Sequence, residues 1–142
     1  MRELLRAGGQ VRELLLAEGR EPDAALDEVL ALARDAGVRI RRVDRARLDD
    51  ATGGLVHQGV VAVAPPFQTV SLAQVLARAE AAGEPPLLVA LDGVTDPHNL
   101  GSIARTAEAV GAHGLLLPGR RTASVTPVVE KAAAGALAHL PV

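Results

Sequence analysis

The sequence predicts an α/β protein made of two units. Short apolar runs alternate with amphipathic stretches of helical period, a pattern typical of helices packed on mostly parallel strands. The stretch that begins at Pro65 and Pro66 has no apolar periodicity, so the chain is expected to divide near residue 66. A chain of 142 residues, 49% of them hydrophobic, has enough apolar side chains for one ordinary domain or two small ones.

The first unit is expected to alternate helices and strands. Apolar residues at helical spacing follow Pro22, which suits the first position of a helix, and Gly37 follows the last of them. The next run alternates apolar residues with arginines, like a half-exposed strand, and GVVAVA reads as a buried strand. The expected helices are 3–7, 22–36 and 45–51, and the expected strands are 11–17, 38–43 and 59–64.

The second unit is expected to begin with a helix that Ser71 caps and Gly83 ends. Further helices are expected at 97–110 and 126–138, and strands at 87–93, 114–119 and from 140 onward. Two strands and the start of a third would leave a parallel sheet with open edges. The second unit is therefore expected to be incomplete.

Composition excludes several classes of protein. There is no cysteine, and the four histidines lack ligand spacing, so neither disulfides nor a metal site are expected. No apolar run is long enough to span a membrane and the N-terminus lacks the apolar run of a secretory signal, so a cytoplasmic protein without membrane contact is expected. A net charge of −2 implies that any contact with RNA is local, and Phe67, the only aromatic residue, offers no stacking platform.

Basic residues cluster in one stretch of the first unit. A guanidinium binds phosphate through a planar fork, so such a cluster suits an RNA backbone. An ordinary solvated surface is the alternative interpretation. The cluster consists of Arg39, Arg41, Arg42, Arg45 and Arg47, of which the first three are the candidate RNA-binding residues.

The loop after the strand at 87–93 is rich in polar residues. Ligands of open parallel sheets bind beyond the carboxyl ends of the strands, which is where this loop lies. Asp96 is expected to cap the helix that starts at Pro97, and capping alone is the favoured role for it. The other polar residues of the loop and first turn are Asp92, Thr95, His98 and Asn99.

Helical geometry assigns the two faces of the helix at 97–110. The outer face is expected to carry Arg105 with Gly101 one turn before it, which would leave a notch where a ribose or another backbone fits. This geometry equally fits an ordinary exposed arginine. His98 and Ser102 share the outer face, and the expected buried face comprises Leu100, Ile103, Ala104, Ala107, Val110 and Gly111.

Three segments resemble one enzyme family. The run LDGVTDPHNLGSIARTAEAVGA at 91–112 is similar to the first motif of the SpoU/TrmH RNA ribose 2′-O-methyltransferases, a branch of the knotted SPOUT class. HQGVVAVAPP at 57–66 resembles the end of the substrate-binding domain found in the branch that methylates ribosomal RNA. VTPVVEKAAAGALAHLPV at 125–142 resembles the next family block, with Ala133 where the family commonly has a serine.

The resemblance implies a domain plan. Residues 1–66 would form an α/β RNA substrate-binding domain, 67–86 a linker with a leading helix, and 87–142 the first part of a SPOUT methyltransferase domain, a knotted Rossmann-like fold. The family's two later motifs, which form the knot and the donor pocket, do not occur before Val142. The resemblance thus implies a C-terminally truncated chain whose cofactor-binding residues lie beyond Val142.

The resemblance also implies an activity and its residues. Asn99 and Arg105 match the family's catalytic asparagine and arginine, with His98 and Ser102 beside them as candidate RNA contacts. The methyl donor would be S-adenosylmethionine and the acceptor a ribose 2′-hydroxyl, most often of a guanosine in 23S rRNA. The complete protein is expected to be a homodimer.

Two other functions are alternatives to this one. A non-catalytic RNA-binding module would use only the N-terminal unit and its arginine cluster. A nucleotide-binding α/β domain unrelated to RNA would need a glycine-rich phosphate loop, and no GxGxxG or Walker sequence follows any expected strand. The first alternative stays open, and the second is disfavoured.

Overall fold

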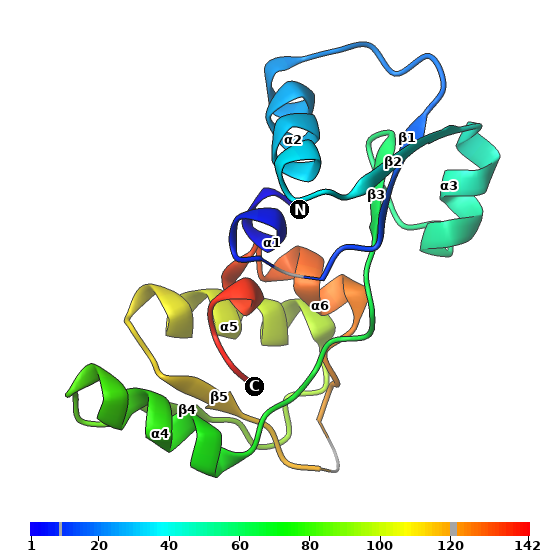
Figure 1. Ribbon diagram of the computed structural model, residues 1–142. Helices are drawn as coiled ribbons and strands as arrows, with labels where there is room; N and C mark the ends of the chain where they lie inside the picture. The colour runs from blue at the N-terminus through cyan, green and yellow to red at the C-terminus, as the bar shows by residue number, and fades with distance from the viewer. Residues whose placement is uncertain (9, 120–121) are drawn as a thin grey trace. The chain divides into compact units, whose positions relative to one another are not determined.

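The computed structural model describes residues 1–8, 10–119 and 122–142. The chain forms two compact units, Met1–Pro65 and Pro66–Val142, and each has its own sheet and its own core (Figure 1). This mixed architecture confirms the expected α/β fold class. No described helix is both long and apolar enough to cross a membrane.

In its described residues, the first unit has three strands and three helices. Strand β1 lies in the centre of the sheet, with β2 parallel to it on one side and β3 antiparallel on the other. The elements are α1 (Arg2–Arg6), β1 (Glu13–Ala17), α2 (Ala24–Asp35), β2 (Arg39–Val43), α3 (Arg45–Thr52) and β3 (Val60–Val63). All six expected elements are therefore present, with boundaries shifted by a few residues.

Two details of this unit differ from expectation. The helix α2 begins at Ala24 rather than Pro22, because the carboxylate of Asp23 accepts a hydrogen bond from the Leu26 amide and so acts as the cap. That amide, together with the Arg20 guanidinium, holds the pKa of Asp23 below its ordinary value. The strand β3 is antiparallel to β1, whereas the sequence pattern indicates mostly parallel strands. The amide of Ala17 at the end of β1 donates to the carbonyl of Gly59, so β3 runs back along β1 from there.

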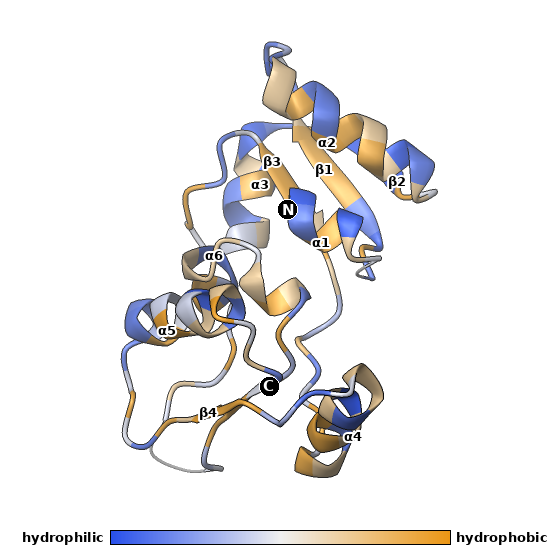
Figure 2. Ribbon diagram, turned by 90° about the vertical axis from the view of Figure 1, so that its left-hand side faces the viewer, coloured by the Kyte–Doolittle hydropathy of each residue, from blue (hydrophilic) through white to orange (hydrophobic). Residues whose placement is uncertain are grey.

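Each face of the first sheet is covered by helices. Strand side chains alternate, so Leu14 faces α1 and α2 while its neighbour Leu15 faces α3. Figure 2 shows β1 as an apolar strand between these polar-faced helices. On the α3 side, Leu48 is the fully buried residue that the helix contributes to the core.

The second unit has a two-stranded parallel sheet between helices. Gly114 in β5 faces Val75 of α4, whereas the next residue, Leu115, belongs to the core that α5 and α6 cover. Ser71 caps α4, as the sequence predicts, and the side chain of Gln74 completes a capping box. The elements are α4 (Leu72–Ala82), β4 (Leu88–Ala90), α5 (Pro97–Ala109), β5 (Gly114–Leu116), α6 (Pro127–Ala132) and the 3-10 helix η1 (Ala136–Ala138).

The C-terminal segment differs most from the prediction. One helix was expected over 126–138, but α6 ends at Ala132 because Ala134 and Gly135 adopt left-handed backbone angles, with φ of 53° and 102°. No strand forms at 140–142. The carbonyl of Pro141 nevertheless accepts a hydrogen bond from Leu115, and that of Val142 accepts one from Val70. The chain end therefore lies beside β5.

The helices α5 and α6 cross at Gly101. A Cβ atom at Gly101 would lie 2.5 Å from the Cβ of Ala132 and 2.8 Å from the backbone nitrogen of Ala133. Gly101 is buried, so the expected exposed notch beside Arg105 is wrong, because α6 fills it. Val110 was expected in the core but is 61% exposed, since α5 ends one residue before it.

The change Gly101→Ala is expected to destabilise the second unit by about 2 kcal/mol or more. Overpacking costs about 1–3 kcal/mol or more, and here the contacts include backbone atoms, so the penalty exceeds the ~1 kcal/mol that alanine gains over glycine in a helix. Denaturant unfolding followed by circular dichroism measures the change. Gly119→Ala is the matched control, because nothing described lies within 4 Å of its added Cβ. Equal stability of Gly101→Ala and the unaltered chain would disprove the close crossing.

Candidate active site and RNA-binding surface

The loop at 91–96 joins β4 to α5 at the carboxyl end of the second sheet. Asp96 accepts hydrogen bonds from the backbone amides of His98, at 2.6 Å, and Asn99, at 3.3 Å. These bonds confirm the capping role predicted for Asp96. They also fix the start of the helix that carries the candidate catalytic residues.

The four candidate residues of α5 are all exposed. His98, Ser102 and Arg105 lie on one outer stripe of the helix, as the sequence predicts. Asn99 lies apart from Arg105, about 9 Å along the helix axis and about 120° around it. The two candidate catalytic residues therefore flank opposite sides of the buried stripe formed by Leu100, Ala104 and Ala107.

Arg105 is available for a ligand. Among the described residues, the Arg105 guanidinium has no ion pair or hydrogen-bond partner. Arg105 lies one turn after Gly101, on the side of α5 against which α6 packs. The side chain of Asn99 likewise has no hydrogen bond within the described part of the chain. A guanidinium with free donors on a rigid helix suits recognition of a phosphate.

Thr122 and Ala123 are hydrogen-bonded to the loop at 91–96. The hydroxyl of Thr122 and the backbone amide of Ala123 both donate to the carbonyl of Val94, at 2.9 and 2.8 Å. At the strand ends, the amide of Leu91 donates to the carbonyl of Leu116. The loops that follow β4 and β5 are thus joined. Sequence reasoning missed this connection, because nothing local to Thr122 signals it.

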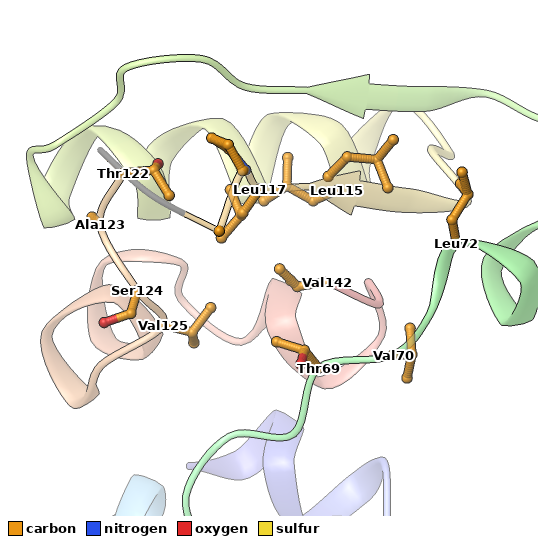
Figure 3. Close-up of a pocket in the computed structure, with 13 residues that line it drawn as sticks. Thr69, Val70, Leu72, Leu115, Leu117, Thr122, Ala123, Ser124, Val125 and Val142 are labelled. Carbon is orange, nitrogen blue, oxygen red and sulfur yellow. The ribbon is translucent and has the colours of Figure 1, made fainter.

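A pocket of about 500 Å³ lies at the carboxyl end of β5, within the second unit (Figure 3). Its walls are mostly apolar, and none of the described lining residues is charged. The end of the chain contributes Val142, and the segment before α4 contributes Thr69 and Val70. The pocket was not predicted from the sequence. The remaining lining residues are Leu72, Leu115, Leu116, Leu117, Pro118, Gly119, Thr122, Ala123, Ser124 and Val125.

The arginines of the first unit are divided between the two faces of β2. Arg39 and Arg41 share a face with Glu13 of β1, whose carboxylate lies 3.9 and 3.6 Å from their Nε atoms. Arg42 has the opposite orientation, because alternate residues of a strand point to opposite faces. β2 is an edge strand, so these exposed side chains border solvent along its length. Arg45 and Arg47 lie on α3.

Two family models match the chain. Residues 1–70 match the substrate-binding model of the RNA 2′-O ribose methyltransferases, and residues 86–142 match the SpoU rRNA methylase family. The chain belongs to the SpoU methyltransferase family. The substrate-binding match covers the first unit, with the β2 arginines, and continues to residue 70, whereas the methylase match lies within the second unit and contains the candidate residues of α5.

Relatives of this SpoU protein occur in mycobacteria. An uncharacterized tRNA/rRNA methyltransferase of Mycobacterium avium is 47% identical over 141 residues, which are 99% of this chain and 45% of the relative. One from Mycobacterium tuberculosis is 45% identical, over 99% of this chain and 43% of the relative. The chain therefore spans just under half the length of the curated relatives it matches.

Solved SpoU structures share the fold. The SpoU methyltransferase AviRb from Streptomyces viridochromogenes, in complex with AdoMet, aligns with a TM-score of 0.72 at 31% identity, over 98% of this chain and 48% of that one. An AdoMet-bound rRNA methyltransferase from Sinorhizobium meliloti aligns with a TM-score of 0.71 at 26% identity, over 99% of this chain and 50% of that one.

Proposed function

We propose that this chain supplies the substrate-binding domain and the first part of the catalytic domain of an RNA ribose 2′-O-methyltransferase. Residues 1–66 would hold the RNA, 67–86 would link the two parts, and 87–142 would carry the catalytic residues. The observation that carries this proposal is the exposed Arg105, which lies without an ionic partner among the described residues on a helix at the carboxyl end of a parallel strand. The family membership supports it.

The proposed substrate is ribosomal RNA. We infer a guanosine of 23S rRNA as the methylated nucleotide and a homodimer as the state of the whole protein, working in the cytoplasm. The tRNA/rRNA methyltransferase names of the relatives support an RNA substrate in general. The adenosylmethionine-bound neighbours support the choice of donor.

The proposed chemistry assigns Arg105 an electrostatic role. When bound, S-adenosylmethionine would supply an activated methyl group: the ribose 2′-oxygen bonds to the methyl carbon as its carbon–sulfur bond breaks, S-adenosylhomocysteine leaves, and the hydroxyl proton passes to solvent water. An arginine stays protonated, so Arg105 acts by orienting a phosphate of the RNA and stabilising the developing alkoxide rather than by accepting the proton. Asn99, on the other flank of the helix, positions the ribose or the loop beside it.

The pocket at the carboxyl end of β5 suits one part of the donor. Its apolar walls, with hydroxyls from Thr69 and Ser124, fit a nucleoside that is held by contact and a few hydrogen bonds. No charged side chain among the described lining residues faces the amino and carboxylate groups of the methionine part. We infer that this chain forms one wall of the donor site and that residues beyond Val142 complete it.

A non-catalytic RNA-binding module is the second candidate function. The exposed arginines along the edge strand β2 favour it, because they would act without any part of the second unit. Gel shifts on fragments of ribosomal RNA, with the chain and with residues 1–66 removed, test where the RNA binds. Full binding after that removal would contradict an RNA-binding role for the first unit.

The double change Arg39→Gln and Arg41→Gln is expected to weaken RNA binding and to lower its dependence on salt. Each lost phosphate contact lowers the slope of log affinity against log salt by about 1. Fluorescence anisotropy at several salt concentrations measures both quantities. The control is the double change Arg34→Gln and Arg78→Gln, which removes the same charge from two other exposed positions. If the two double variants lose equal affinity for RNA, Arg39 and Arg41 do not form a specific RNA-binding surface.

Arg105→Lys is expected to reduce methylation by at least about tenfold, because lysine keeps the charge but loses the planar fork. The assay uses a chimera of this chain with the remaining part of the Mycobacterium avium relative. Transfer of a tritiated methyl group gives the rate, and resistance of the product to alkaline hydrolysis identifies the 2′ position. Arg78→Lys serves as the control, and full activity of Arg105→Lys would remove the argument for the guanidinium.

This chain alone is expected to bind S-adenosylmethionine with a dissociation constant weaker than about 100 μM, because the described pocket residues pair with none of the donor's charged groups. Isothermal titration of the chain, with the chimera as the positive control, measures the constant. A low-micromolar value for the chain alone would refute the inference that residues beyond Val142 complete the site.

A further inference from the structure

The carbonyl of Val94 receives two hydrogen bonds from one short segment. One comes from the hydroxyl of Thr122 at 2.9 Å, and the other from the backbone amide of Ala123 at 2.8 Å. Val94 is half-buried and packs against the core of the second unit. Two residues later the same loop reaches Asp96, whose carboxylate caps α5. A shift at Val94 would therefore reach the start of α5 through only two residues.

Thr122 also faces the pocket. It lines the cavity together with its neighbours Ala123 and Ser124, and Figure 3 shows its side chain on the pocket wall. Thr122 thus borders the pocket and is hydrogen-bonded to the loop that leads into α5, the helix that carries Asn99. The backbone amide of Ala123 is present whatever the side chains are, whereas the hydroxyl of Thr122 depends on the residue type.

We propose that Thr122 is a positioning residue, which holds the loop at 91–96, and with it Asn99, in place against the pocket through its hydroxyl bond to Val94. The role rests on the proposed function, because it assumes that the pocket takes the methyl donor and that Asn99 serves the reaction. The hydroxyl of Thr122 is engaged by the carbonyl of Val94. It acts through the loop.

A single-residue label tests this in the chain as it exists. Asn99 is the only asparagine, so ¹⁵N-asparagine labelling gives one backbone amide signal, from the amide that donates to Asp96. Lys131 is the only lysine, and its amide reports on α6 in the same unit.

Thr122→Val removes the hydroxyl at nearly constant volume, and Thr122→Ser keeps it. Thr69→Val makes the same change on the pocket wall, at a hydroxyl without a hydrogen bond within the described residues.

In Thr122→Val we expect hydrogen exchange at the Asn99 amide to be about fivefold faster, with the Lys131 amide unchanged. Thr122→Ser and Thr69→Val should match the unaltered chain. The proposal is overturned by an unchanged Asn99 rate in Thr122→Val, or by a failure of Thr122→Ser to restore it. Equal acceleration at Lys131 would also overturn it, since Thr122 would then stabilise the unit as a whole.

The chimera gives the functional readout. Thr122→Val is expected to lower kcat by about tenfold with both KM values within about twofold, because misplacing a group slows the chemical step more than it weakens binding. Thr122→Ser should restore kcat. An unchanged kcat in Thr122→Val overturns the positioning role. If the chimera with the unaltered chain transfers no methyl group, the proposed function fails, and the exchange rates still decide whether Thr122 holds the loop.

Discussion

The close crossing of α5 and α6 at Gly101 is the constraint on which the second unit depends. Without a side chain at this position, the backbone of α6 lies against α5, and Ala132 and Ala133 fill the space. Any larger residue would push the helices apart. The crossing fixes the rotation of α5 about its axis, and this rotation decides that Arg105 lies on the α6 flank and Asn99 on the other.

The candidate site is assembled from segments that are distant in the sequence. The loop after β4, residues 115–119 and 122–125, the stretch before α4 and the chain end at Val142 meet at the carboxyl end of the second sheet. Hydrogen bonds between backbones hold much of this arrangement, including those from Leu91 to Leu116 and from Val70 to Val142. Backbone hydrogen bonds between distant segments therefore position much of the site.

The first unit presents its charges differently. Glu13 lies between Arg39 and Arg41 on one face of the sheet, so part of the positive charge is balanced within the protein. These are partly exposed pairs at 3.6 Å or more, and such pairs stabilise a fold by only about 0–1 kcal/mol. In the proposed complex with RNA, a phosphate would replace Glu13 as the partner of these arginines. The basic residues are thus concentrated along the edge strand β2, although the net charge of the whole chain is −2.

The sequence by itself determined the fold class, the positions of the main helices and strands, the caps at Ser71 and Asp96, and the family motif that singles out Asn99 and Arg105. These features follow from residues within a few positions of one another, where periodicity and capping act. Tertiary structure alone decided that Gly101 is buried, that β3 is antiparallel, that the helix expected over 126–138 breaks at Ala134, and that Thr122 bonds to Val94. Each of these depends on packing or pairing between segments far apart in the chain, or, at Ala134, on a backbone angle that alanine rarely adopts. The local sequence pattern therefore does not predict them.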